Sequence, residues 1–184
     1  MTTLLLAVDV GNTNVSLGIF DYAAGEAELA HHWRLSTHRE QTSDEVAGTL
    51  RSLFSQSSCK LENFSDVILC SVVPPLQPIW ERVCEKLFRR PPIVIGLGTR
   101  TGMPVRYENP REVGADRIVN AVAAFELVGG PVVAVDFGTA TTFDCVSEAG
   151  EYLGGAIFPG IHISMEALFE RASMLHRVEI ARPR

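Results

Sequence analysis

An internal repeat is the feature that most restricts the fold of this 184-residue chain. The string AVDVGNTN at residues 7–14 aligns without gaps on AVDFGTAT at residues 134–141. Both contain Ala-Val-Asp, an apolar residue and Gly, with Thr close behind. A duplication with this period of 127 residues predicts two similar lobes that face one another. A chance match of a short pattern is the alternative explanation.

The order of the predicted secondary structure repeats as well. Apolar runs, turn residues and helical spacing predict an α/β chain whose first copy has the order βββαβαβα. We expect strands at residues 4–10, 15–20, 29–35, 66–73 and 91–95 and helices at residues 43–54, 76–88 and 114–128. The second copy repeats βββα, with strands at residues 132–136, 141–146 and 152–157 and a helix at residues 161–175. Continuous apolar runs predict that the strands at 4–10, 66–73 and 132–136 are buried, the first on both faces.

These patterns predict two domains, at residues 1–128 and 129–184. If the copies match in length, the second lacks roughly 70 residues, so we expect a truncated second lobe. The exposed edge of its unfinished sheet would favour aggregation.

Composition excludes several classes of protein. The net charge is −6, and the lysines are Lys60 and Lys86, so no basic block exists for a nucleic acid. The four cysteines show no CxxC spacing, which fits a reducing compartment better than a disulfide framework. The N-terminal apolar run has no basic residue before it and is interrupted by Asp9, which indicates neither a signal peptide nor a membrane span. We expect a cytoplasmic protein.

The two repeated turns are candidate phosphate-binding loops. Asp9 ends a buried strand and is followed by Gly11-Asn12-Thr13, whose backbone N–H groups and hydroxyl suit an anion. The carboxylate of Asp9 would hold Mg²⁺, usually through water. The second loop, residues 136–142, would grip the remaining phosphates, and its Thr hydroxyls suit oxyanions or a monovalent cation. The alternatives are a plain hairpin for the first loop and a strand of β-branched residues for the second.

A third candidate site is the string GADR at residues 114–117. If a helix begins there, Asp116 lies in its first turn, where the helix dipole stabilises an anion. In a functional role, Asp116 would accept the proton of an attacking hydroxyl, and a carboxylate of ordinary basicity suffices for phosphoryl transfer. Arg117 would pair with a substrate carboxylate or with the transferred phosphate oxygens.

Other nucleotide-binding patterns are absent or weak. The sequence contains no GxxxxGK[ST], so a P-loop is excluded. The glycine-rich residues 96–102 follow a strand, but the third Gly is one residue late for a dinucleotide loop and no helical pattern follows.

Four strings together, in this order and spacing, resemble the type III pantothenate kinases of bacteria: DVGNT (9–13), GADR (114–117), VDFGTATT (135–142) and GGAIFPG (154–160). The resemblance extends from Leu5 to about Leu175. It implies two actin-like (ribonuclease H-like) lobes with ATP between them, commonly in a homodimer. The implied reaction transfers the γ-phosphoryl group of ATP to the primary hydroxyl of pantothenate, which gives 4′-phosphopantothenate in the first step towards coenzyme A. Family members continue well beyond residue 184.

The resemblance also implies roles for matching residues. The first phosphate loop would be formed by Asp9, Val10, Gly11, Asn12, Thr13, Asn14, Val15 and Ser16. The pantothenate site would be lined by Tyr107, Gly114, Ala115, Asp116 and Arg117, with Asp116 as the catalytic base. Asp136 would help to hold K⁺ or NH₄⁺, Thr139 would contact ATP, and Asp9 would lie near Mg²⁺.

Two other functions fit parts of the sequence. A non-catalytic relative would act as an accessory factor in transcription, although it would not need all of Asp9, Asp116, Arg117 and Asp136. An actin-like phosphohydrolase acting on polyphosphate or a nucleotide would not need the GADR pocket.

Overall fold

The computed structural model describes residues 4–22, 25, 27–57, 59–96, 98–172, 174, 176 and 180–181. Its residues form two compact units, which are considered separately. Unit 1 comprises residues 1–100 and 114–116, and unit 2 comprises residues 101–113 and 117–184. The repeat-based boundary between residues 128 and 129 differs from this division, because most of the helix at residues 115–128 packs with the second sheet.

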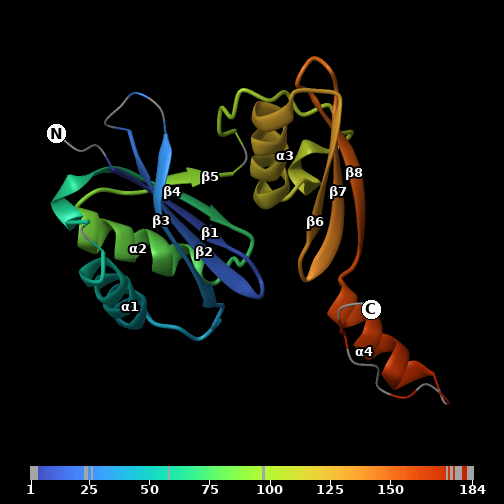
Figure 1. Ribbon diagram of the computed structural model, residues 1–184, viewed down its shortest axis with the longest axis horizontal. Coiled ribbons are helices and arrows are strands. Elements are labelled where there is room, and N and C mark those ends of the chain that lie inside the picture. Colours follow the sequence, from blue (N-terminus) through green and yellow to red (C-terminus); the bar gives the residue numbers. More distant parts are fainter. Residues whose placement is uncertain are drawn as a thin grey trace. The chain divides into compact units, whose positions relative to one another are not determined.

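Unit 1 is built on a five-stranded sheet with the order β3-β2-β1-β4-β5. Its strands are β1 (Leu4–Val10), β2 (Asn14–Asp21), β3 (Glu28–Ser36), β4 (Phe64–Ser71) and β5 (Ile93–Ile95). The central strand β1 pairs antiparallel with β2 and parallel with β4. Helices α1 (Ser43–Ser55) and α2 (Gln77–Phe88) pack on the same side of this sheet (Figure 1). A short 3-10 helix, η1 (Leu61–Asn63), precedes β4.

The core of unit 1 lies between the sheet and these two helices. Alternate residues of β1 are buried there, from Leu4 to Val10, and Leu50 of α1 and Trp80 of α2 meet them. The prediction that β1 is buried on both faces is wrong, because Leu5 and Ala7 are half-buried and Asp9 is exposed. An apolar run therefore did not distinguish a strand with one fully covered face from a strand covered on both.

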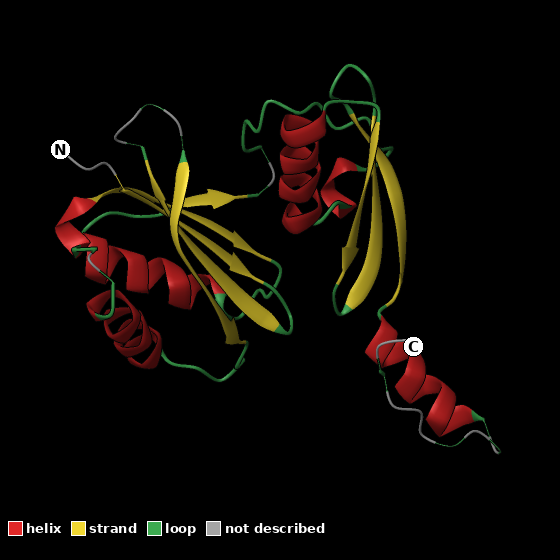
Figure 2. Ribbon diagram, viewed as in Figure 1, coloured by secondary structure: helices red, strands yellow, loops and turns green. Residues whose placement is uncertain are grey.

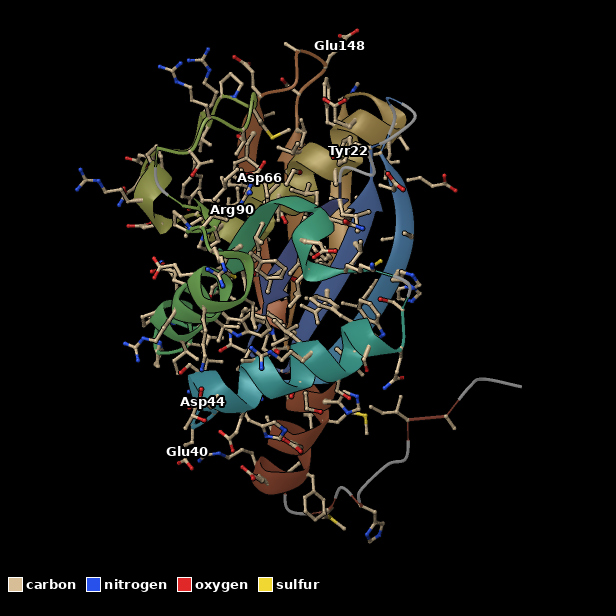
Figure 3. The ribbon with its side chains drawn as sticks, turned by 90° about the vertical axis from the view of Figure 1, so that its left-hand side faces the viewer. Tyr22, Glu40, Asp44, Asp66, Arg90 and Glu148 are labelled. Atoms are coloured by element: carbon tan, nitrogen blue, oxygen red, sulfur yellow. The ribbon has the colours of Figure 1, made fainter. Side chains whose placement is uncertain are left out.

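Surface ion pairs link the two helices of unit 1 to each other and link the end of α2 to the sheet. Lys86 of α2 donates to Asp44 in the first turn of α1, at 2.6 Å. Arg90, just after α2, lies 3.8 Å from the carboxylate of Asp66 on β4. Figure 3 labels Asp44, Asp66 and Arg90 on this side of the molecule.

Unit 2 contains an antiparallel three-stranded sheet with the order β6-β7-β8. Its elements are η2 (Pro110–Glu112), α3 (Ala115–Val128), β6 (Val132–Phe137), β7 (Ala140–Val146), β8 (Tyr152–Pro159) and α4 (Ile161–Arg171). Helix α3 covers one face of the sheet (Figure 2), where Ala121 packs with Val146 and Tyr152. The predicted helix at residues 161–175 ends at Arg171, and Leu175 lies outside the described residues.

The other face of this sheet is apolar and exposed. Cross-strand pairing places Val133, Val135, Phe137, Phe143 and Phe158 on one face. Val133, Val135, Phe137 and Phe158 are 53%, 43%, 71% and 55% exposed. The prediction that residues 132–136 form a buried strand is therefore wrong, because every residue of this strand is half-buried or exposed.

Candidate functional site

The turn between β1 and β2 is short, and hydrogen bonds from the residue that follows β3 hold it in place. The amide of Gly11 donates to the carbonyl of Asn14 at 3.0 Å. Thr37, directly after β3, fixes the turn at two points: its hydroxyl donates to the Gly11 carbonyl at 2.7 Å, and its amide donates to the Thr13 carbonyl at 2.9 Å. These bonds satisfy inward-facing carbonyls and hold the first predicted phosphate loop in one shape.

The side chains of this predicted loop divide into buried and exposed groups. Val10 and Val15 are 0% and 2% exposed, so a ligand would reach only their backbone. Asn12, Thr13 and Ser16 are exposed. The side-chain carbonyl of Asn12 accepts a hydrogen bond from Arg39 at 3.1 Å.

The carboxylates of Asp9 and Asp116 both raise the pKa of the buried thiol of Cys70. Asp9 lies beside Cys70 in the parallel register of β1 and β4. Burial raises the pKa of the Cys70 thiol to about 12, and the charges of Asp9 and Asp116 and a hydrogen bond with Asp9 raise that pKa further. Asp116 lies in the first turn of α3 and is half-buried, as are Gly114 and Ala115 beside it. Two predicted site carboxylates, far apart in sequence, thus lie near one point of unit 1.

Arg117 is held by a buried carboxylate that the sequence did not reveal. Its guanidinium donates to Asp144 of β7 at 2.7 and 2.6 Å and to the Phe143 carbonyl at 3.0 Å. Asp144 is 1% exposed, and it also accepts from the hydroxyl of Tyr152 at 2.8 Å. Burial and this hydrogen bond raise the pKa of Tyr152.

This network changes the interpretation of Arg117. The guanidinium side chain is 13% exposed, and Asp144 neutralises its charge. Sequence reasoning expected Arg117 to face a substrate carboxylate or phosphate. One sequence feature could have indicated this partner. Asp144 is an ionisable residue within a predicted strand of β-branched and apolar residues, where a buried charge needs a counter-charge.

The second repeated turn joins β6 to β7 and is closed by the end of β8. The amide of Gly138 donates to the Ala140 carbonyl, and the amide of Gly160 donates to the Thr139 carbonyl, both at 3.0 Å. Helix α4 begins directly after Gly160, so its N-terminus lies beside this turn. Asp136 is exposed near the end of β6, and Asn120 of α3 donates to its carboxylate at 3.4 Å.

Tyr107, a predicted substrate residue, packs over β8 of the same unit. The ring is 39% exposed and lies against Gly154. A Cβ atom at Gly154 would lie 2.8 Å from the ring, so any side chain there would displace Tyr107.

Two features are absent from the described residues. They contain no group of three or more His, Cys, Asp or Glu side chains arranged to hold a metal ion. None of their helices is long and apolar enough to cross a membrane.

Comparison with known proteins identifies similar sequences along almost the entire chain. The family described as type III pantothenate kinase matches residues 5–184. Proteins of that name from Moorella thermoacetica and Myxococcus xanthus are each 56% identical over 180 residues. The protein from Halalkalibacterium halodurans is 50% identical over 181 residues. Each alignment covers 98% of this chain and 69 to 70% of the relative.

Solved structures share the fold at low sequence identity. The type II variant of the Aquifex aeolicus Ppx/GppA phosphatase aligns with a TM-score of 0.53 and 16% identity, covering 92% of this chain and 56% of that one. A reductive activator for a corrinoid, iron-sulfur protein aligns with a TM-score of 0.52 and 9% identity, covering 96% and 33%. At these identities the likeness concerns the mixed α/β fold alone.

Proposed function

The chain belongs to the type III pantothenate kinase family, and on that premise we propose that the protein transfers the γ-phosphoryl group of ATP to the primary hydroxyl of pantothenate. The product is 4′-phosphopantothenate, in the first step of coenzyme A synthesis. The observation that supports this function most directly is the proximity of Asp9 and Asp116 to the same thiol. One carboxylate would serve the phosphates and the other the attacking alcohol.

In the proposed reaction, Asp116 is the catalytic base. It would accept a hydrogen bond and then the proton from the pantothenate hydroxyl as the phosphorus–oxygen bond forms. It lies in the first turn of α3, where the helix dipole favours an anion, and the carboxylate is the form that accepts a proton. Because the transition state is loose, orienting the hydroxyl contributes more than strong basicity.

The turn between β1 and β2 would hold phosphate oxygens through the backbone amides of its exposed residues Asn12 and Thr13 and through the Thr13 hydroxyl. The hydrogen bonds from Thr37 fix this turn before ATP binds, so little ordering is needed on binding. The exposed carboxylate of Asp9 offers the hard oxygen ligand that Mg²⁺ prefers, and Asp116 supplies a second anion near it. Mg²⁺, when bound, would neutralise charge on the phosphate oxygens.

Asp136 and Thr139 would serve the second turn. The exposed carboxylate of Asp136 would supply oxygen ligands to a weakly held monovalent cation such as K⁺ or NH₄⁺. Thr139 lies next to the N-terminus of α4, where an anion is stabilised, and would contact ATP. Tyr107, Gly114, Ala115 and Arg117 would line the pantothenate site. Asp144 fixes the guanidinium of Arg117, which favours a role in shaping that site.

The proposal includes the larger architecture implied by the repeat. Residues 1–128 and 129–184 would be copies of an actin-like lobe, since both begin with antiparallel β-meanders that carry an Asp at the end of the first strand. The exposed apolar face of β6-β7-β8 would be covered by a further part of the second lobe or by a second subunit in a homodimer. The proposal also assigns the protein to the cytoplasm.

The test is an ADP-release assay with pantothenate as the varied substrate, in the presence of Mg²⁺ and K⁺. The Asp116→Asn variant should lower kcat by about 10²- to 10⁴-fold, because it removes the proton acceptor but keeps the size of the side chain. The control variant Glu148→Gln changes an exposed carboxyl in the turn between β7 and β8 and should keep full activity. Circular dichroism would verify that both variants are folded.

Three outcomes would contradict parts of this proposal. Full activity of Asp116→Asn would remove Asp116 from the base role. ADP release that does not depend on pantothenate would identify a phosphohydrolase, and no turnover with any acceptor would favour a non-catalytic factor. Equal rates in K⁺ and Na⁺ would exclude the monovalent site at Asp136.

A further inference from the structure

Three exposed polar side chains form a row across the face of the unit 1 sheet that lies opposite α1 and α2. Asp9 of β1 pairs with Ser16 of β2, and Ser16 pairs with Arg34 of β3. In β1 and β2 the buried residues alternate with these positions and face the helices. Arg34 stands between Trp33 and Leu35, which pack against the core. Because side chains alternate along a strand, the three polar side chains share one face, and we call them the polar row.

The guanidinium of Arg34 has no ion pair or hydrogen bond with any other side chain that the structure describes. The neighbouring pairs on the same face are Asn14 with Ser36 and Gly18 with His32. None of these four residues is a carboxylate. The positive charge is therefore available to an anion from outside the chain.

Ser16 separates the two charges of the polar row. Adjacent strands lie about 4.8 Å apart, so the Cα atoms of Arg34 and Asp9, two strands apart, are about 10 Å from each other. A phosphate group above Ser16 would have the guanidinium on one side and the carboxylate proposed for Mg²⁺ on the other. Ser16 also belongs to the predicted phosphate loop, so the row extends that loop by one strand.

The strand order places Arg34 at the end of the row away from the proposed base. Beyond Asp9 the row continues to Cys70 of β4, and the charge of Asp116 acts on that thiol. The attacking and leaving oxygens stand roughly in line on opposite sides of the transferred phosphorus. If the alcohol approaches from the side of Asp116, the phosphate beside Arg34 belongs to the departing ADP.

We propose that Arg34 binds the β-phosphate of the nucleotide, an inference that rests on the proposed kinase function and assigns it a further residue. As the pantothenate oxygen bonds to the γ-phosphorus, the bond from that phosphorus to the β–γ bridging oxygen breaks. The electron pair of the broken bond stays on ADP, and Asp116 takes the proton of the alcohol. A guanidinium offers two parallel N–H groups to phosphate oxygens, and a cation already in place stabilises the charge that develops there.

The test measures the binding of ADP with Mg²⁺ by isothermal titration calorimetry, which does not require phosphoryl transfer. Arg34→Gln should weaken binding about tenfold or more, because it removes charge-assisted hydrogen bonds at an exposed position. Arg34→Lys keeps the charge without the paired N–H groups and should fall between the two. The matched control is Arg51→Gln, which changes an exposed arginine of α1, on the other side of the sheet, and should bind ADP normally.

Two further measurements locate the contact and test its part in the reaction. In ³¹P NMR of bound ADP, Arg34→Gln should move the β-phosphorus signal more than the α-phosphorus signal. In the ADP-release assay, it should lower kcat/KM for ATP by at least the factor found for ADP binding, because the contact strengthens as charge develops on ADP.

The role of Arg34 is overturned if Arg34→Gln binds ADP as tightly as Arg51→Gln, if both phosphorus signals move equally, or if the unchanged protein does not bind ADP. A failure of the proposed function gives a different result. A protein that loses ADP affinity in Arg34→Gln, yet never phosphorylates pantothenate, would contradict the kinase and retain the phosphate contact.

Discussion

At the scale of single residues, Asp144 is the buried charged side chain of the described residues, and its ion pair matters for stability. Its carboxylate is buried in unit 2 and is neutralised by Arg117, while Tyr152 donates to the same oxygen. Removing one member of such a pair leaves the other charge buried without compensation, which costs more than the intact pair contributes.

We therefore expect Asp144→Ala to lower the free energy of unfolding by about 3–5 kcal/mol, because the guanidinium of Arg117 stays largely buried. The matched control is Glu151→Ala, which breaks the ion pair with Arg106 at 2.8 Å on the surface and should cost less than about 1 kcal/mol. Urea unfolding measures both. Equal costs for the two variants would show that the buried pair is not needed for stability.

The sequence named candidate site residues, which remain predictions, but not the partners that these residues have in the structure. Asp9, Asp116 and the two turns were predicted, because carboxylates and small residues after apolar runs are visible locally. Asp144 was missed, since its meaning depends on Arg117, 27 positions away, and an isolated Asp in a strand has no signature of its own. The indole N–H of Trp80, which has no hydrogen-bond partner among the described residues, was equally invisible, because burial and pairing arise only from packing.

At the scale of elements, the boundaries of α1 show how local signals fix structure. Thr42 is the N-cap: its hydroxyl accepts from the amide of Glu45, and the Glu45 carboxylate accepts in return from the Thr42 amide at 2.7 Å. The hydrogen bonds that the Glu45 carboxylate accepts from the Thr42 amide and hydroxyl lower the pKa of Glu45. This reciprocal arrangement satisfies two orphan donors of the first turn.

Replacing Thr42 with Ala should lower the free energy of unfolding by about 1 kcal/mol, because the Glu45 amide loses its acceptor. Ser52→Ala removes a hydroxyl from the exposed interior of the same helix and should be neutral or slightly stabilising. Thermal or urea unfolding distinguishes them. A Thr42→Ala variant as stable as Ser52→Ala would contradict the cap.

The elements were predicted to within a few residues, whereas their burial was not. Strand β1 and the turn after it follow from an apolar run and Gly11-Asn12-Thr13. How many faces of a strand are covered depends on where helices pack, and that depends on contacts between distant segments. For this reason the predictions of burial failed for β1 and β6, although both strands exist at the predicted positions.

At the scale of the whole molecule, the uncovered face of β6-β7-β8 is the most consequential surface. Its valines and phenylalanines form a contiguous apolar patch rather than scattered exposed residues. The relatives are longer than this chain, which spans about 69% of their length. Contiguous exposed apolar patches generally mark interaction surfaces.

We expect the 184-residue chain to associate as its concentration rises and to bind an apolar dye such as ANS. The double variant Val133→Thr/Val135→Thr should reduce both effects, because it adds hydroxyls to the patch while keeping β-branched side chains. The matched control Leu127→Gln/Val128→Thr changes exposed apolar residues at the end of α3, away from that patch. Sedimentation velocity measures the association, and an equal response of both double variants would contradict this role of the sheet face.

Gly160 packs against the turn between β6 and β7 and is also the N-cap of α4. A Cβ atom there would lie 2.3 Å from the carbonyl oxygen of Gly138 and 2.5 Å from that of Thr139, and the same residue is the N-cap of α4. One added methyl group would therefore push the turn between β6 and β7 away from the N-terminus of α4. It would disturb both the turn and the helix cap. Selection on this chain would be expected to reject every alternative amino acid at position 160, however stable the rest of the protein is.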